Sequence, residues 1–456
     1  MDYTSILNKL RPTEQEKTKI KEISHRIIDF LNDYCKKESI NANTVLVGSV
    51  AKGTYLQGKS DIDIFITFPL ETSMDYLKEM GLKLGYLCNE KFNGVASEHY
   101  ASHPYLTSEI EGFEIDFVPC YQIEDGSQLK SAVDRTVLHT NFIKANLKES
   151  QKDDVLLLKR FMDMTGTYGS EFKVGGFAGY LCELLIVKYG DFETTLKEAS
   201  KWRYGTVIDL MDYKTSKLFN DPLIAIDPTD KNRNVAAALR LDKMAEFIQS
   251  ARNYLNSNIK EEYFNPINKN TNKKNLLNQI KDNESEFIVV KFDIPEIPLD
   301  TLHPQLKKTV ESLSEKLVDE EFNVFASDYW TDEEKVAVFI FEMASSTLNK
   351  IKINKGPKVF IERGCQQFID AHGLENCYIK DDFLVMNVER EFTSAVSYIK
   401  HVFTSENIAL IKIGKNLKDS LLYSYSFISL EDISSDNSKF WSFIDDFLNP
   451  GQYIKR

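Results

Sequence analysis

Two acidic residues, Asp61 and Asp63, stand one residue apart at the start of an apolar stretch, and Gly48 and Ser49 precede them across a short spacer. Side chains alternate along a strand, so both carboxylates are expected on one face. Carboxylates this close repel each other unless a cation lies between them, and Mg²⁺ commonly takes carboxylates together with phosphate oxygens. A Gly-Ser turn before a helix offers backbone N–H groups to a triphosphate. The combination predicts a site for a metal ion and a nucleotide.

A third acidic residue follows in a predicted β-hairpin. The strands His103–Ile110 and Phe113–Val118 are expected on either side of a two-residue Glu-Gly turn. In the second strand Asp116 lies on the face opposite the apolar side chains. An ionised Asp among apolar neighbours is costly to bury, so it must be exposed at an edge or bound to something. Given the two acidic residues upstream, we expect Asp116 to bind the same metal.

The elements that must position these side chains are visible in the hydrophobic pattern. A strand is predicted over Thr44–Val47, and a long amphipathic helix is predicted to start at a capping box of Thr13 and Glu16. Another helix is expected to begin at Asn234 and to end near Tyr254. After an Asn- and Lys-rich stretch (256–286), strands are predicted over 287–292, 321–329 and 335–343, and helices over 304–318, 359–372 and 395–403. The pattern predicts an α+β multidomain fold.

Composition limits the class of protein. The chain has 456 residues, 42% hydrophobic and 27% charged, which suits a soluble globular protein of two to four domains. It shows no signal peptide and no apolar run of about eighteen residues, so we expect a cytoplasmic protein without a membrane partner. The six scattered cysteines indicate neither a disulfide framework nor a zinc site.

Charge bears on RNA binding. The net charge of −13 argues against general affinity for nucleic acid, so an RNA-binding protein of this composition must gather its basic residues on one face. One candidate is the cluster Lys350, Lys352, Lys355 and Lys358. A basic strand of this kind is typical either of contact with an RNA backbone or of a sheet edge guarded by Lys.

Five ordered stretches resemble the archaeal-type (class I) CCA-adding enzymes, which are tRNA nucleotidyltransferases of the polymerase-beta-like superfamily. They are GSVAKGTYLQGKSDIDIF, FEIDFVPCY, SAVDRTVLHT, TYGSEFKVGGFAGYLCELL and DPTDKNRNVAAAL. The resemblance implies an N-terminal nucleotidyltransferase (head) domain of sheet and helices over 1–150. It further implies a helical central domain over 151–256 that completes the nucleotide pocket, and C-terminal α+β modules over 257–456 that bind tRNA.

The resemblance also implies roles for individual residues. Asp61, Asp63 and Asp116 match the catalytic, metal-binding carboxylates. The positions that match nucleotide-binding residues are Gly48, Ser49, Lys52, Thr136, His139, Lys159, Tyr168 and Arg233. Lys52 stands where the family usually has Arg, which keeps the charge but loses the bidentate fork. Without the resemblance, His139 would be interpreted as a structural histidine and Lys159 as part of a solvated helix face.

The implied activity is template-independent addition of C, C and A to the 3′ end of tRNA. The substrates would be CTP and ATP, the cofactor two Mg²⁺ ions, and the second product pyrophosphate. The implied partners are the acceptor stem and TΨC arm of tRNA and, as in many relatives, a second subunit in a homodimer. One alternative is another template-independent RNA nucleotidyltransferase, such as a poly(A) polymerase or an oligonucleotide synthetase. The other is a non-catalytic RNA-binding adaptor on the same fold, which would not need three converging acids.

Overall fold

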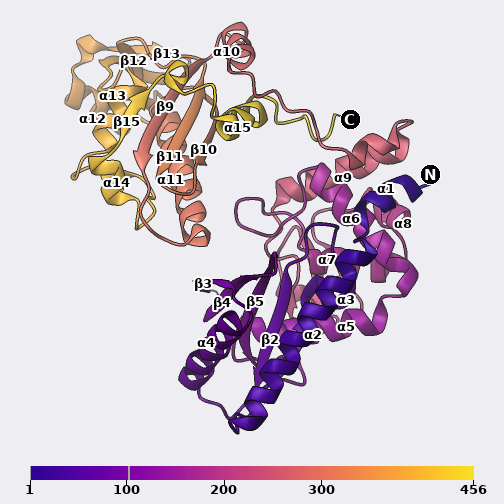
Figure 1. Ribbon diagram of the computed structural model, residues 1–456. Helices are drawn as coiled ribbons and strands as arrows, with labels where there is room; N and C mark the ends of the chain where they lie inside the picture. The colour runs from indigo at the N-terminus through magenta and orange to yellow at the C-terminus, as the bar shows by residue number, and fades with distance from the viewer. Residues whose placement is uncertain (1, 101–102, 456) are drawn as a thin grey trace. The chain divides into compact units, whose positions relative to one another are not determined.

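The structure is a computed structural model that describes residues 2–100 and 103–455 (Figure 1). The chain forms two compact units, which we describe separately: residues 1–267 with 451–456, and residues 268–450. In the described ranges, no helix has both the length and the apolar character needed to cross a membrane.

The first unit contains the sheet that carries the predicted carboxylates. Its strand order is β1-β2-β5-β4-β3. The strands are β1 (Asn43–Val47), β2 (Ile62–Phe68), β3 (Val95–Tyr100), β4 (Pro104–Ile110) and β5 (Phe113–Tyr121). Strands β2 and β5 are parallel and the other neighbours antiparallel. The predicted hairpin is confirmed as β4 and β5, whereas β3 was not predicted.

Helices cover both faces of this sheet. The long helices α2 (Glu14–Lys37) and α4 (Met74–Lys91) pack on the apolar face formed by Ile62, Ile64, Ile66 and Phe68. The other face carries a smaller core that includes Phe65 and Val118, against which side chains at the start of α5 (Arg135–Asn146) pack. The short helix α3 (Gly48–Lys52) links β1 to β2.

The predicted capping box of α2 forms only in part. The Thr13 hydroxyl accepts the backbone N–H of Glu16, as expected. The Glu16 carboxylate accepts the N–H of Gly58 instead of returning to the cap. The acidic member of the box therefore ties the loop before β2 to the helix.

The rest of the first unit is mainly helical around an aromatic core that includes Phe161, Phe177 and Phe247. Its helices are α1 (Thr4–Leu10), α6 (Lys152–Met164), α7 (Gly179–Tyr189), α8 (Phe192–Ala199) and α9 (Leu241–Asn256). It also holds a three-stranded sheet that was not predicted, β6 (Thr206–Asp209), β7 (Leu223–Asp227) and β8 (Asp230–Asn234).

The prediction that a helix begins at Asn234 is wrong. Asn234 ends strand β8, and helix α9 begins only at Leu241. The Asn234 side chain accepts the N–H groups of Ala225 and Ala236 and donates to the carbonyl of Leu223. It therefore fixes the strand against β7 rather than capping a helix, and it places Arg233 on a strand.

The second unit is built on a four-stranded sheet in the order β10-β11-β9-β15. The strands are β9 (Glu286–Asp293), β10 (Val324–Thr331), β11 (Val336–Met343) and β15 (Ser426–Ile428). Helices α11 (Leu299–Asp319), α13 (Ala395–Val402) and α14 (Lys418–Tyr423) pack on one face, and α10 (Lys273–Asp282) and α15 (Ser438–Leu448) on the other. The strands and helices predicted for this region are confirmed, with shifts of a few residues at their ends.

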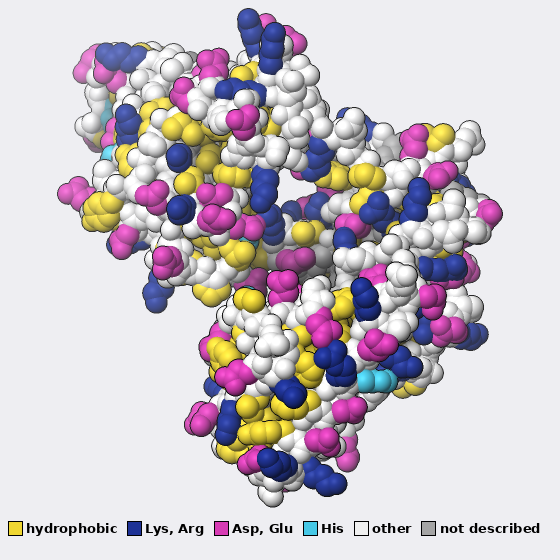
Figure 2. Space-filling model, in the orientation of Figure 1, with side chains coloured by type: hydrophobic (Ala, Val, Ile, Leu, Met, Phe, Trp, Pro, Cys, Tyr) yellow, Lys and Arg dark blue, Asp and Glu magenta, His cyan; other side chains and the backbone are white. Residues whose placement is uncertain are grey.

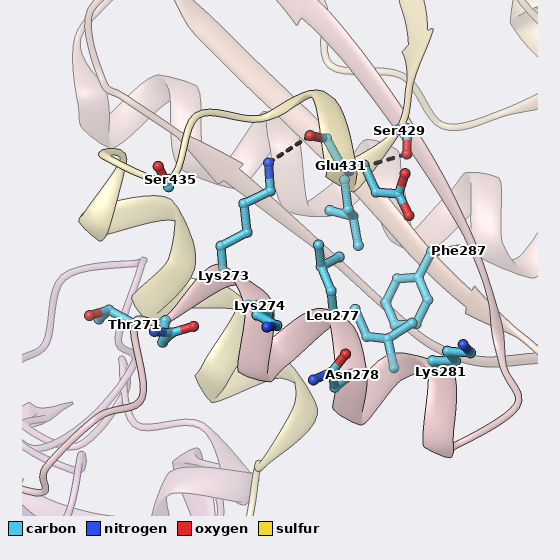
Figure 3. Close-up of a pocket in the computed structure, with 13 residues that line it drawn as sticks. Thr271, Lys273, Lys274, Leu277, Asn278, Lys281, Phe287, Ser429, Glu431 and Ser435 are labelled. Carbon is cyan, nitrogen blue, oxygen red and sulfur yellow. Dashed lines mark hydrogen bonds between the residues drawn. The ribbon is translucent and has the colours of Figure 1, made fainter.

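A groove lies between α10 and the segment around Ser429–Ser435 (Figure 3). Lys273 reaches across it and donates to the carbonyls of Glu431 and Ile433. Leu277 and Phe287 form part of its apolar floor. These contacts fasten α10 to the rest of the unit.

The clustered lysines belong to a small sheet, β12-β14-β13, made of β12 (Ile351–Lys358), β13 (Cys377–Lys380) and β14 (Phe383–Glu389), with α12 (Glu362–His372) beside it. Strand β12 is an edge strand. Lys350 pairs with Glu389 and Lys358 with Asp382, at 2.9 and 2.8 Å. Because these two charges are already paired, the geometry favours the guarded-edge interpretation for Lys350 and Lys358.

Candidate active site

The three predicted carboxylates come from two separate chain segments. In the parallel pair β2 and β5, Asp63 and Asp116 are direct partners, and Asp61 immediately precedes β2. The Thr107 hydroxyl, on the neighbouring strand β4, donates to Oδ1 of Asp116 at 2.6 Å. The sheet therefore holds Asp63 and Asp116 side by side.

Burial and the negative charges of neighbouring carboxylates raise the pKa values of Asp63 and Asp116. Burial, together with the charges of Asp116 and Asp61, raises the pKa of Asp63 to about 7. Burial also raises the pKa of Asp116, and the charge of Asp61 adds to that shift even though Thr107 opposes it. Across residues 2–100 and 103–455, no group of three or more His, Cys, Asp or Glu side chains is arranged so that it could hold a metal ion, and this includes Asp61, Asp63 and Asp116 as a set of three. The paired carboxylates nevertheless fit a hard cation that takes its remaining oxygens from substrate or water, because such an ion relieves their repulsion.

Gly48 makes a close approach to this group. Its φ is +73°, and a Cβ built on it would lie 1.8 Å from Oδ2 of Asp63, so no larger residue fits without displacing the carboxylate. The Gly48 N–H donates to the Thr140 hydroxyl at 3.3 Å, which in turn donates to the carbonyl of Thr136 at 2.8 Å. Thr140, which the sequence did not single out, thus joins the glycine turn to α5.

A cavity of about 290 Å³ is lined by Asp61, whereas Asp63 and Asp116 are not part of its lining. Five of the predicted residues line it, and the complete lining is Ser49, Lys52, Tyr55, Leu56, Lys59, Asp61, Lys159, Tyr168, Gly179, Tyr180 and Glu183. Helix α7 begins at this cavity with Gly179, so the helix start adds backbone N–H groups suited to an anion. The cavity combines cationic side chains with a helix N-terminus, as a triphosphate requires.

One buried carboxylate, Glu183, holds the two lysines of this cavity. Its Oε2 lies 2.5 Å from Nζ of Lys52, and its Oε1 lies 3.8 Å from Nζ of Lys159. Oε1 also accepts the Thr54 hydroxyl at 2.5 Å, and Lys159 donates to the Thr54 carbonyl at 2.8 Å. Burial lowers the pKa of Lys159, and the charge of Glu183 opposes this shift. The sequence analysis did not single out Glu183, which is the one acidic residue in the largely apolar helix α7.

A second buried carboxylate, Asp227, holds His139 and Arg233. Its Oδ2 lies 2.8 Å from Nε2 of His139 and 2.9 Å from Nη1 of Arg233. Burial alone would raise the pKa of Asp227, but the contact with His139 keeps it below its ordinary value. Burial also lowers the pKa of His139.

These residues stand next to the cavity rather than in its lining. The His139 ring stacks on Tyr180, with ring centroids 4.0 Å apart, and Tyr180 does line the cavity. Thr136 and Arg233, like His139, are absent from the lining. The structure thus brings Lys52 and Lys159 together at Glu183, and His139 and Arg233 together at Asp227. Thr136 is linked through Thr140 to Gly48 instead.

The surface offers no large basic area on the side shown in Figure 2. There, Lys and Arg side chains are interspersed with Asp and Glu over both units. Any contact with RNA on this side must therefore rest on small groups of basic residues.

Comparison with known proteins identifies the family of this chain. Family models match three ranges: the nucleotidyltransferase domain over 27–139, the second domain of tRNA nucleotidyltransferase over 153–265, and the C-terminal domain of CCA-adding enzymes over 284–429. The CCA-adding enzyme of Methanothermobacter thermautotrophicus is 45% identical over 100% of this chain and 99% of its own. Those of Methanosarcina mazei (94% of each chain) and Methanocaldococcus jannaschii (90% and 92%) are both 36% identical. The chain belongs to the CCA-adding enzyme family of tRNA nucleotidyltransferases.

Proposed function

We propose that this nucleotidyltransferase adds C, C and then A to the 3′ end of tRNA, from CTP and ATP and without a nucleic-acid template. The observation that carries the proposal is the pairing of Asp63 with Asp116 on parallel strands, next to Asp61, which lines a cavity together with Lys52 and Lys159. Family membership supports the choice of tRNA and of these nucleotides.

The reaction is a nucleotidyl transfer. The 3′ oxygen of the RNA forms a bond to the α-phosphorus of the nucleotide, the bond from that phosphorus to the β-phosphate oxygen breaks, and pyrophosphate leaves. Asp61, Asp63 and Asp116 would hold two Mg²⁺ ions, which when bound lower the pKa of the attacking hydroxyl and offset charge on the phosphoryl oxygens. Thr107 keeps Asp116 in a fixed orientation through its hydrogen bond.

The chain's own residues would bind and orient the nucleotide. Lys52 and Lys159 lie in the cavity next to Ser49 and would bind the triphosphate, held in place by Glu183. Gly48 and Tyr168 would complete this part of the site. Thr136, His139 and Arg233 would lie toward the nucleoside, with Arg233 oriented by Asp227 to donate to the incoming base.

We further propose the division into a head domain over 1–150, a central domain over 151–256 and C-terminal modules over 257–456. The C-terminal modules would contact the acceptor stem and the TΨC arm of tRNA by shape, which is how proteins usually recognise A-form RNA. The enzyme would act as a homodimer. Family resemblance supports each of these assignments.

Product analysis tests the activity. A tRNA that ends at its discriminator base is incubated with CTP alone and with CTP plus ATP, and the products are resolved one nucleotide at a time. Two additions with CTP alone, and a third only when ATP is present, are the expected result. Long A tails would instead indicate a poly(A) polymerase, and no addition would indicate an adaptor.

A further inference from the structure

A second cavity lies in the first unit, next to the catalytic cavity but separate from it. Its volume is about 740 Å³, within the range typical of small-molecule sites. Side chains from α2, α3, α5 and α6 line it, together with the segment that follows α1. None of the predicted catalytic or nucleotide-binding residues belongs to the lining. We call this cavity the α2 groove.

The α2 groove carries an excess of positive charge. Five Lys and Arg side chains line it against three carboxylates, and His25 adds a titratable ring. Each carboxylate already pairs with one of the cations, in the pairs Arg11–Asp153, Lys17–Glu14 and Lys152–Glu149. Lys21 and Lys144 form no ion pair within the described residues, so two positive charges remain available to a ligand.

The inner wall of the α2 groove is apolar and contains one buried hydroxyl without a partner. Ile20, Val50 and Leu156 contribute to the apolar surface, and the Tyr55 ring lies among them. Ser24 is fully buried, and its Oγ has no hydrogen-bond partner in the described structure.

The α2 groove also borders the nucleotide-binding helix α3. Tyr55 lines both the α2 groove and the catalytic cavity. Gly53, the C-cap of α3, lies beneath Lys152, since a Cβ on Gly53 would be 3.1 Å from Nζ of Lys152. Helix α3 begins with Gly48 and Ser49, so one five-residue helix has the proposed triphosphate site at its start and the α2 groove at its end.

We propose that the α2 groove is a second ligand site, which binds a small phosphate-bearing molecule of nucleotide size. Lys21 and Lys144 neutralise the phosphate groups, and the apolar wall with Tyr55 takes the uncharged part. The combination of two unpaired lysines with apolar side chains in a cavity of this size distinguishes the groove from an ordinary charged surface. The proposal does not depend on the identity of the RNA substrate.

Counting bound ligand tests the proposal. Equilibrium dialysis of the full chain with labelled ATP gives the number of ATP molecules bound, for the wild type and for the double variant Lys21→Glu/Lys144→Glu. The expected result is one binding site fewer in the variant, or at least about a tenfold loss of affinity at that site, because charge-assisted contacts are lost. Tripolyphosphate, which lacks a base, should compete for the same site more weakly than ATP.

A matched control removes the effect of net charge. Lys19→Glu/Lys36→Glu changes two exposed lysines of the same helix α2 that do not line the groove. This variant should bind as many ATP molecules as the wild type.

Three results would overturn the proposal. The first is that Lys21→Glu/Lys144→Glu binds as many ATP molecules as the wild type, with unchanged affinity. The second is an equal loss in the Lys19→Glu/Lys36→Glu control. The third is a fall in tRNA affinity that is specific to Lys21→Glu/Lys144→Glu, which would make the groove an RNA contact. None of these readouts depends on CCA addition, so they fail or succeed separately from the proposed activity.

Discussion

Glu183→Gln removes the one carboxylate between two buried lysines and should destabilise the first unit strongly. The side chain of Glu183 is 0% exposed, and those of Lys52 and Lys159 are 8% and 4% exposed. Gln keeps the size of the side chain and can still accept the Thr54 hydroxyl, but it leaves both ammonium groups without a counter-charge. Breaking a buried ion pair in this way typically costs about 3–5 kcal/mol.

The assay must report on the first unit alone. Hydrogen exchange of peptides from α6 and α7, measured in increasing urea, gives the free energy of opening of that part. Tripolyphosphate should restore part of the lost stability, because its oxygens supply negative charge to Lys52 and Lys159.

A surface pair provides the control. Glu198 lies 2.6 Å from Lys201, but their side chains are 41% and 67% exposed, so Glu198→Gln should cost at most about 1 kcal/mol. If the two substitutions differ by less than about 1 kcal/mol, Glu183 does not act as a buried counter-ion and this reasoning is wrong.

Three further predictions concern the same site. Gly48→Ala and Gly58→Ala both place a side chain at positive φ, at a cost of about 1–2 kcal/mol. Only Gly48→Ala should abolish nucleotide transfer, because nothing lies within 4 Å of a Cβ at Gly58. Equal activity in the two variants would contradict the role of Gly48. Because the pKa of Asp63 is raised to about 7 in the folded state, its contribution to stability is present in acid and lost as the pH rises through 7. Urea midpoints measured between pH 5 and 8 without divalent ions should fall as this contribution is lost. Asp63→Asn should remove the fall. Asp227→Asn should raise KM for both CTP and ATP by about tenfold, since His139 and Arg233 lose a charged hydrogen-bond partner. The control is Asp212→Asn, at an exposed position. An unchanged KM in Asp227→Asn would contradict the positioning role of Asp227.

Local patterns were sufficient to predict the carboxylates and the elements that carry them. The alternation of apolar residues along β2 and β5 fixes which face each Asp occupies, and that face depends only on the residues next to it. The position of Asp116 beside Asp63 then follows from the pairing of the two strands, which the sequence alone did not specify. The expectation that Asp116 joins Asp61 and Asp63 came from the two acidic residues upstream, and the family resemblance implies the same role.

The partners that hold the site together could not be predicted, because they are distant in sequence. Glu183 meets Lys52 across 131 residues, and Asp227 meets His139 across 88. Both acids lie inside stretches that carry the family resemblance, but nothing in those stretches specifies which basic residue each acid contacts. The wrong helix start at Asn234 has the same origin, since its side chain bonds to Ala225 and Leu223 on another strand. The local sequence indicates a possible helix cap at Asn234, but hydrogen bonds to residues distant in sequence hold it in a strand instead.

The most direct test of the account is the single-turnover rate of C addition by Asp116→Asn, measured together with tRNA affinity. The substitution keeps the shape of the side chain and can keep the hydrogen bond from Thr107, but it removes the charge that lies beside Asp63. We expect the rate to fall by at least about a thousandfold, because a carboxylate that holds the metal ion is lost. The affinity for tRNA should be unchanged. A rate within a few-fold of the wild type would show that the paired carboxylates of β2 and β5 do not perform the transfer.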